Sequence, residues 1–135
     1  MSLFRVKYLS FFLGLISIFS FFNIIYSYYF NLYLNLNTYY FSLIISSILA
    51  IVFYNIQSDY KKPSIYEKIL TVFFGYFLLP LILSIPFYFS IYNLTFFNSL
   101  FESVSGFTST GFTIFENIKH IDPGLILWRS SIQWL

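Results

Sequence analysis

Long apolar segments alternate with short polar ones along this chain. The apolar segments run from about 8 to 30, from 38 to 56 and from 66 to 92. At about 1.5 Å per residue, each is long enough as a helix to cross the roughly 30 Å hydrocarbon layer of a bilayer. The third contains Pro80 and Pro86, which membrane helices tolerate and which predict kinks or an early end. This pattern predicts an all-α integral membrane protein.

A shorter apolar segment, from about 95 to 107, has apolar residues at helical spacing but cannot cross a bilayer. The polar run 108–113, Thr-Ser-Thr-Gly-Phe-Thr, follows it directly. A short helix followed by hydroxyl residues and a glycine, between two membrane helices, is typical of a re-entrant pore loop. The last apolar segment, about 124 to 135, would rise about 18 Å as a helix, too little to span. We therefore expect an incomplete last helix and a chain that is a fragment of a longer protein.

Composition indicates a lipid environment and excludes several kinds of site. The chain is 59% apolar and only 9% charged, whereas soluble domains carry charge on about a quarter of their residues. It contains no cysteine, which excludes disulfides and thiolate sites. The single His120 has no partner at ligand spacing for a transition metal, and the net charge of +2 is too small to indicate nucleic acid. No cofactor is expected, and Lys119, His120 and Asp122 are interpreted as ordinary loop residues.

Positive charge predicts the orientation in the membrane. The basic residues next to the spans are Arg5, Lys7, Lys61, Lys62 and Lys68. They precede the first span or lie between the second and third, and basic residues collect in cytoplasmic loops. We therefore expect a cytoplasmic N-terminus and linker, with the segments 31–37 and 93–123 on the outer side.

Three short motifs occur in order in the second half of the chain. Residues 84–87 read S-I-P-F, residues 101–113 read F-E-S-V-S-G-F-T-S-T-G-F-T, and residues 127–135 read L-W-R-S-S-I-Q-W-L. Together they resemble the TrkH/KtrB potassium transporters, whose patterns run S-L-P-F, F-E-S-x-S-G-F-T-T-T-G-x-T and W-R-S/Q-x-x-Q-W-x-G-G. The resemblance implies two leading membrane helices, in residues 1–62, and then a first pore repeat in residues 63–135. In that repeat it implies a membrane helix, a pore helix, a filter at 108–113 and a second, incomplete helix.

The resemblance also implies a chemistry for the loop. Backbone carbonyls replace the water that a potassium ion loses in a filter, without fixed charge that would trap it. Ser109, Thr110, Gly111 and Phe112 are the expected carbonyl donors. Gly111 supplies the unusual dihedrals that glycine adopts at little cost. Phe112 is larger than the alanine that many relatives carry there. Thr108, Thr113, Glu102 and Arg129 are the residues expected to support the filter.

Two features have more than one interpretation. Glu102 is either a charge near the outer pore mouth or a structural partner of Arg129, because an ionised group at membrane depth needs a partner. The Ser-Thr-Gly run 109–111 is either part of a filter or only a helix C-cap and turn. The residues alone leave both interpretations of Glu102 open. For the run 109–111, the three motifs together favour a filter.

The expected function is uptake of potassium across a bacterial plasma membrane. The expected partners are the lipid bilayer and K⁺, with Na⁺ as a second candidate ion. By resemblance, a cytoplasmic nucleotide-binding regulatory subunit and a second copy of the chain are implied partners. A membrane enzyme would need several ionisable groups meeting at one site, and only Glu102, His120 and Arg129 are available. The remaining alternative is a truncated or accessory membrane protein without transport activity, and we expect this chain alone to be inactive.

Overall fold

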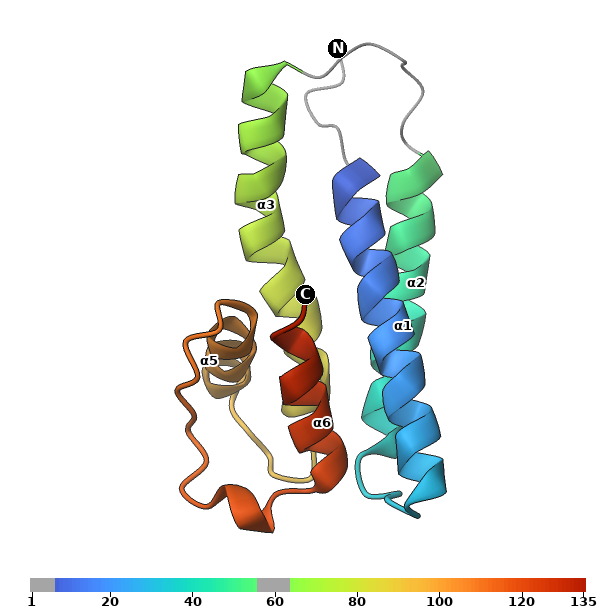
Figure 1. Cartoon of the computed structure of the whole chain (residues 1–135), viewed down its shortest axis with the longest axis vertical. Helices are drawn as coiled ribbons and strands as arrows, with labels where there is room; N and C mark the ends of the chain where they lie inside the picture. Colours follow the sequence, from blue (N-terminus) through green and yellow to red (C-terminus); the bar gives the residue numbers. More distant parts are fainter. Residues whose placement is uncertain (1–6, 56–63) are drawn as a thin grey trace.

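The computed structural model describes residues 7–55 and 64–135, and within these ranges the chain is helical, with no strand (Figure 1). The helices are α1 (Lys7–Tyr29), α2 (Leu36–Asn55), α3 (Ile65–Leu83), α4 (Ile85–Tyr88), α5 (Phe96–Phe107), a 3₁₀ turn (Ile118–His120) and α6 (Pro123–Ile132). Three stretches, Leu9–Tyr29, Leu36–Asn55 and Lys68–Tyr88, are long and apolar enough to cross a membrane. The chain is an integral membrane protein with three candidate spans.

Helices α1 and α2 form a hairpin in which small hydroxyl residues face each other. The hydroxyl of Ser20 donates to that of Ser42 over 3.1 Å, and the hydroxyls of Ser17 and Ser46 lie 2.8 Å apart. The small side chains let the two backbones approach, and the paired hydroxyls stabilise helix contacts inside a membrane. The hairpin is therefore held by neutral polar pairs between long apolar faces.

The third apolar segment, expected as one element over 66–92, is divided into α3 and α4 at Ser84 and ends at Tyr88. Two prolines cause this break, since Pro80 and Pro86 cannot donate to carbonyls one turn earlier. The peptide N–H of Ser84 donates to the Pro80 carbonyl over 2.9 Å. The Leu83 carbonyl accepts from the indole Nε1 of Trp128 over 3.1 Å. The kink is thus tied to α6 by a buried tryptophan.

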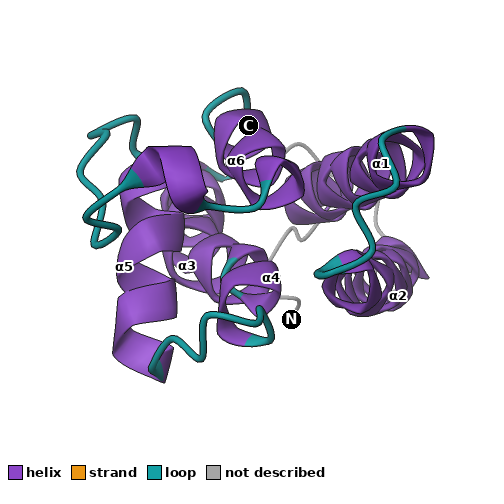
Figure 2. Cartoon of the chain, turned by 90° about the horizontal axis from the view of Figure 1, so that it is seen from below, coloured by secondary structure: helices purple, strands orange, loops and turns teal. Residues whose placement is uncertain are grey.

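Helices α5 and α6 lie beside the lower half of α3 in Figure 1, and α6 lies between α5 and α1 when the chain is seen from below (Figure 2). Gly106 makes the approach of α5 and α6 close, because a methyl group there would lie 3.2 Å from Ile132 Cγ2. Trp128 is fully buried and its ring packs 6.2 Å from that of Tyr39 on α2. Helix α6 therefore joins the hairpin to the rest of the molecule.

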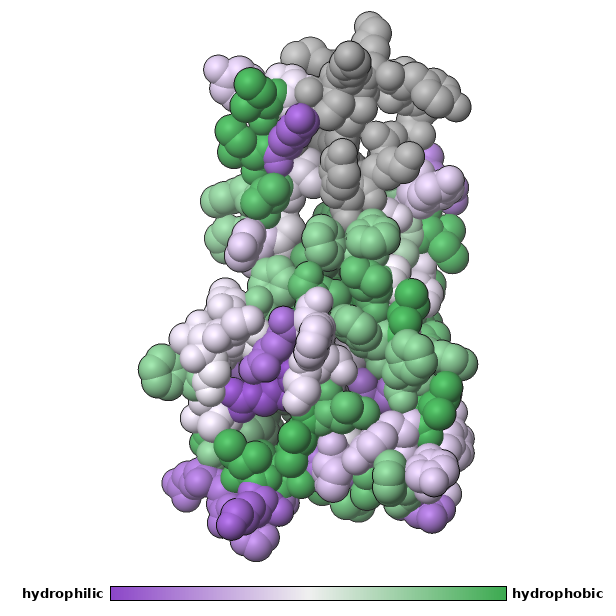
Figure 3. All heavy atoms as spheres, viewed as in Figure 1, coloured by the Kyte–Doolittle hydropathy of each residue, from purple (hydrophilic) through white to green (hydrophobic). Residues whose placement is uncertain are grey.

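Large apolar side chains cover much of the outer surface. Examples are Phe11 on α1, Ile51 on α2 and Phe77 on α3, each more than 60% exposed. In Figure 3 hydrophobic colours dominate the long helices, and strongly hydrophilic residues gather at the lower end, where the 3₁₀ turn lies. This distribution fits a surface that faces lipid.

The charges that predict orientation fall mostly on undescribed positions. Arg5, Lys61 and Lys62 lie outside the described residues. Of the basic residues expected on the cytoplasmic side, only Lys68 has a described side chain, and it is exposed on α3. The orientation in the membrane stays a prediction.

Candidate functional site

The loop 108–113 begins where α5 ends, about halfway up the molecule. In Figure 1 helix α5 rises from the lower end, and the chain then descends to the 3₁₀ turn before α6 rises beside it. Both ends of this excursion therefore lie at the same end of the molecule. The loop itself is largely exposed.

The first half of the loop caps α5. Ser109 has a φ of +55°, and its N–H donates to the Gly106 carbonyl over 3.0 Å. The N–H of Thr110 donates to the Ser105 carbonyl, also over 3.0 Å. This pair of bonds is a Schellman motif with a serine in the left-handed position that glycine usually occupies. The C-cap interpretation of the Ser-Thr-Gly run is thus present in the structure.

Gly111 needs to be glycine because of its backbone. Its φ is +82°, and a methyl group on it would meet nothing within 4 Å. A larger residue would therefore fit in space but would force its backbone into a conformation that side chains disfavour. The expectation that Gly111 supplies an unusual dihedral is confirmed.

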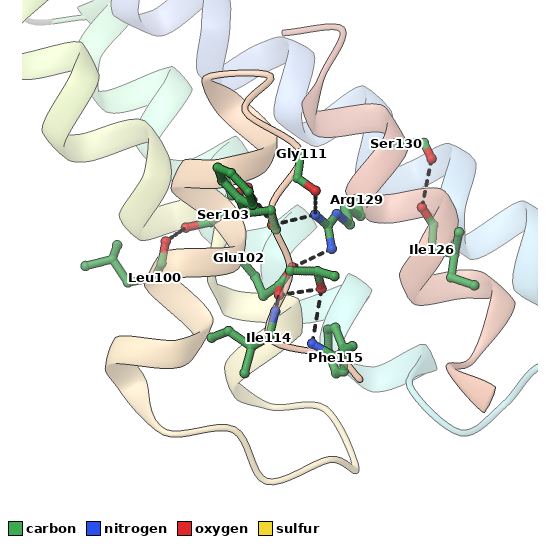
Figure 4. A network of polar contacts seen from close by, with 12 residues as sticks. Leu100, Glu102, Ser103, Gly111, Ile114, Phe115, Ile126, Arg129 and Ser130 are labelled. Atoms are coloured by element: carbon green, nitrogen blue, oxygen red, sulfur yellow. Dashed lines mark hydrogen bonds and ion pairs between the residues drawn. The ribbon is translucent and has the colours of Figure 1, made fainter. Parts of the chain in front are cut away.

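Arg129 of α6 holds the second half of the loop. Its Nη2 donates to the carbonyls of Gly111 over 3.1 Å and of Phe112 over 2.7 Å. Its Nη1 donates to Oε2 of Glu102 over 2.8 Å. In Figure 4 the guanidinium reaches from α6 toward Gly111 and Glu102. One planar group thus links α5, the loop and α6, which suits the fixed fork of an arginine.

Glu102 is fully buried, and its carboxylate has three partners. Besides Arg129, its Oε1 accepts from the Thr113 hydroxyl over 2.7 Å and from the Ile114 N–H over 2.6 Å. A buried charge needs such pairing, since an unpaired one is strongly unfavourable. Of the two interpretations of Glu102, the structure contains the ion pair with Arg129.

The four expected carbonyl donors are not equivalent. The Phe112 carbonyl accepts from both Arg129 and the Ser105 hydroxyl, the latter over 2.6 Å. Two donors occupy both of its lone pairs, so it has no capacity left for a cation. Among the described residues, no donor reaches the carbonyls of Ser109 and Thr110. Gly111 is intermediate, with one bond from Arg129.

The supporting residues act in two different ways. Thr113 holds the loop through Glu102, while the Thr108 hydroxyl donates to the Val104 carbonyl over 2.8 Å and lies 2.6 Å from that of Thr110. Thr108 therefore belongs to the cap. Ser105 also fixes the loop, through Phe112, and the sequence reasoning missed it. The signal available was a serine on the same helical face as Glu102, three positions later.

One loop interpretation is wrong. Asp122, interpreted as an ordinary loop residue, is only 5% exposed. Its Oδ2 accepts from Nδ2 of Asn35 over 2.8 Å, across 87 positions of sequence. The reason is that α6 begins against the end of the α1–α2 hairpin, so its first residues are enclosed. Lys119 and His120 are exposed.

Comparisons with known proteins point to one class, the cation transporters of bacteria and archaea. The chain is 46% identical over 57 residues to the Trk system potassium uptake protein TrkI of Halomonas elongata. It is 35% identical over 52 residues to an uncharacterised cation transporter of Methanocaldococcus jannaschii. It is 37% identical over 43 residues to TrkG of Escherichia coli, also a Trk system potassium uptake protein.

These similarities are partial. They cover 42%, 38% and 32% of this chain, and only 10%, 11% and 9% of the three relatives. The chain thus spans about a tenth of the length of the relatives it matches. No family model matches the sequence, and no solved structure is significantly similar to the fold. Part of this chain is homologous to Trk potassium uptake proteins, which are transporters and not enzymes.

Proposed function

We propose that this chain forms one wall of a potassium pathway in a longer transporter of the Trk type. The observation that carries the proposal is the loop 108–113, in which carbonyls free of protein donors sit beside a backbone fixed by a buried ion pair. The partial homology to potassium uptake proteins supports the choice of ion. The three candidate spans supply the membrane setting.

The chemistry of the loop suits a weakly held cation. A conducted ion must bind well enough to lose water and weakly enough to leave, which uncharged carbonyls achieve. We assign the ion-facing role to the carbonyls of Ser109, Thr110 and Gly111, and an anchoring role to Phe112. Because Glu102 neutralises Arg129, the guanidinium next to Gly111 adds little net positive charge against the ion. Thr108 and Thr113 remain the supporting residues.

The proposed organisation places α1 and α2 as leading helices. Helices α3 and α4 are then the first membrane helix of a repeat, α5 its pore helix and α6 the start of its second helix. The N-terminus is cytoplasmic and the loop 108–113 opens to the outer side of a bacterial plasma membrane. Sodium is a second candidate ion. A cytoplasmic nucleotide-binding regulatory subunit and a second copy of the chain are the proposed partners.

The test is a chimera, because the relatives are about ten times longer than the matched segment. Residues 1–135 replace the part of TrkI from its start to the end of the similar segment, and uptake of ⁸⁶Rb⁺ is measured in cells that lack other potassium uptake. The chimera is expected to transport, and Gly111→Ala is expected to reduce uptake at least tenfold. Gly14→Ala is the matched control. A methyl there meets nothing within 4 Å, as at Gly111, but Gly14 lies inside helix α1.

Membrane insertion is measured for each variant, so that loss of uptake is not confused with loss of protein. A chimera whose uptake is equal with Gly111→Ala and Gly14→Ala would refute the assignment of the loop. The 135-residue chain is tested alone in the same cells. Uptake by the chain alone would contradict our expectation that it needs the remainder of a pathway. A chimera without uptake, although inserted, would favour the accessory alternative.

A further inference from the structure

Four buried side-chain oxygens without a hydrogen-bond partner occur in the described part of the chain. They are Asn23 Oδ1, Ser27 Oγ, Tyr39 Oη and Asp122 Oδ1. All four residues are at most 5% exposed. Buried polar atoms are nearly always paired in folded proteins, so such a group calls for a ligand or a bound water.

Three of these residues converge on one point. A methyl group built on Gly124 would lie 2.9 Å from Tyr39 Oη, 3.2 Å from Asp122 Oδ2 and 3.4 Å from Ser27 Oγ. These atoms come from α2, from the residue that precedes α6, and from α1. Because Gly124 has no side chain, these three oxygens can all lie close to its backbone. Asn23 lies one turn before Ser27, on the same face of α1.

The carboxylate in this group lacks a countercharge. Oδ2 of Asp122 accepts from the neutral side-chain amide of Asn35 over 2.8 Å. The other end of that amide, Oδ1 of Asn35, accepts from the Ile91 N–H over 3.0 Å. No described lysine, arginine or histidine forms an ion pair with Asp122. The start of α6 favours a negative charge at this position through the helix dipole. A charged Asp122 here still needs a cation.

We propose that Asp122, Tyr39 and Ser27 bind a small monovalent cation, such as Na⁺, between the hairpin and α6. Oxygen is the donor that hard cations prefer, and the set contains no nitrogen or sulfur. A single carboxylate matches one positive charge and is too little for a divalent ion such as Ca²⁺. A water molecule would satisfy the hydrogen bonds but would leave the buried charge uncompensated. This site lies apart from the loop 108–113 and does not rest on the proposed potassium pathway.

The first measurement is thermal unfolding of the purified 135-residue chain in detergent. Choline chloride is replaced by NaCl at constant ionic strength, because ligand that binds only the folded state raises Tm. Sodium is expected to raise Tm by several degrees with a saturable dependence. A second signal is the fluorescence of Trp128, whose ring packs on Tyr39, measured with Trp134→Phe as the background.

The variants distinguish sodium bound among these oxygens from sodium bound elsewhere in the chain. Tyr39→Phe removes one candidate oxygen and is expected to weaken the sodium response at least tenfold. Tyr40→Phe is the matched control, because it removes a hydroxyl from the neighbouring, partly exposed residue of the same helix. Asp122→Asn and Gly124→Ala are expected to abolish the response, the second because its methyl group would lie 2.9 Å from Tyr39 Oη and displace the oxygens. Gly14→Ala, inside helix α1 and in contact with nothing within 4 Å, is expected to leave the response unchanged.

Three results would overturn the proposal. One is an equal Tm in sodium and choline with no change in Trp128 fluorescence, which would point to water or a protonated Asp122. Another is a sodium response with the same midpoint in Asp122→Asn. A third is a response lost with Gly111→Ala, which would move the binding to the loop. If Asp122→Asn does not fold, the sodium responses of Tyr39→Phe and Tyr40→Phe are compared instead, and equal responses of the two variants would overturn the proposal.

Discussion

The α1–α2 hairpin and the unit formed by α5, the loop 108–113 and α6 are stabilised by different kinds of interaction. The hairpin uses several neutral pairs between serine hydroxyls, such as Ser20 with Ser42. The loop depends on one charge pair, between the buried Glu102 and the partly exposed Arg129, and on hydrogen bonds that this pair organises. Loss of one hydroxyl leaves a small defect, whereas loss of one charge leaves its partner buried and unpaired. Single substitutions in the hairpin should therefore lower the free energy of unfolding only slightly, whereas loss of one charge at the loop should lower it strongly.

Breaking the ion pair should have the largest effect. Arg129→Leu is expected to lower the free energy of unfolding by about 3–5 kcal/mol, because Glu102 then stays buried without its countercharge. Unfolding is followed by SDS titration in mixed micelles. The double variant Glu102→Gln with Arg129→Leu should recover part of the loss, since it removes both charges. Equal losses in the single and double variants would contradict a charge-based role.

Two glycines give the next contrast. Gly14→Ala is expected to stabilise α1 by up to about 1 kcal/mol, since alanine is the better helix former and nothing lies within 4 Å. Gly106→Ala should lack this gain or destabilise by about 1 kcal/mol, because its methyl lies 3.2 Å from Ile132 Cγ2. The same SDS titration measures both. A gain at Gly106 equal to that at Gly14 would show that α5 and α6 separate freely.

A substitution in the C-terminal cap of α5 is expected to raise the free energy of unfolding by a smaller amount. Ser109→Gly is expected to stabilise by about 0.5–1 kcal/mol, because Ser109 has a φ of +55° and glycine adopts that region without strain. Asn93→Gly is the control, since Asn93 has a φ of +49° but asparagine tolerates this region better than serine. The gain at Asn93 should therefore be smaller. A larger gain there would argue against strain at the cap.

The hairpin should show the smallest change. Ser42→Ala removes the acceptor of the Ser20 hydroxyl, and hydrogen bonds between membrane helices contribute about 0.6 kcal/mol on average. A loss of that order in the SDS titration is expected. A loss as large as that of Arg129→Leu would remove the distinction between the two regions.

Much of the helical arrangement could be predicted from hydropathy. The spans α1 and α2 begin and end within two residues of the expected limits wherever those limits are described, and α5 begins one residue later than expected. The requirement that an ionised Glu102 find a partner named Arg129 in one of the two interpretations that the sequence left open, and the structure contains that pair. In contrast, the bond from Trp128 to the Leu83 carbonyl beside the break is a contact across 45 positions that hydropathy does not encode.

The details of the loop were harder to predict for a related reason. A run of serine, threonine and glycine is compatible both with a cap and with cation-binding carbonyls, and here Ser109 takes part in the cap while its own carbonyl stays free. The engagement of the Phe112 carbonyl requires Ser105 and Arg129 to reach the same atom. The buried Asp122 bonds to Asn35, which lies 87 positions earlier, directly before α2. Each depends on tertiary contacts rather than on local pattern.

The separation of Asn35 and Asp122 by 87 positions has a consequence for biogenesis. A chain made from its N-terminus exposes the hairpin first, and at that stage Asn35 and Tyr39 have no α6 to cover them. The polar side chains of Asn35 and Tyr39 then lie in or near the membrane without these contacts until α6 is synthesised. An insertion machinery that keeps the hairpin close to water or to protein during this interval would spare the nascent chain the cost of burying those groups alone.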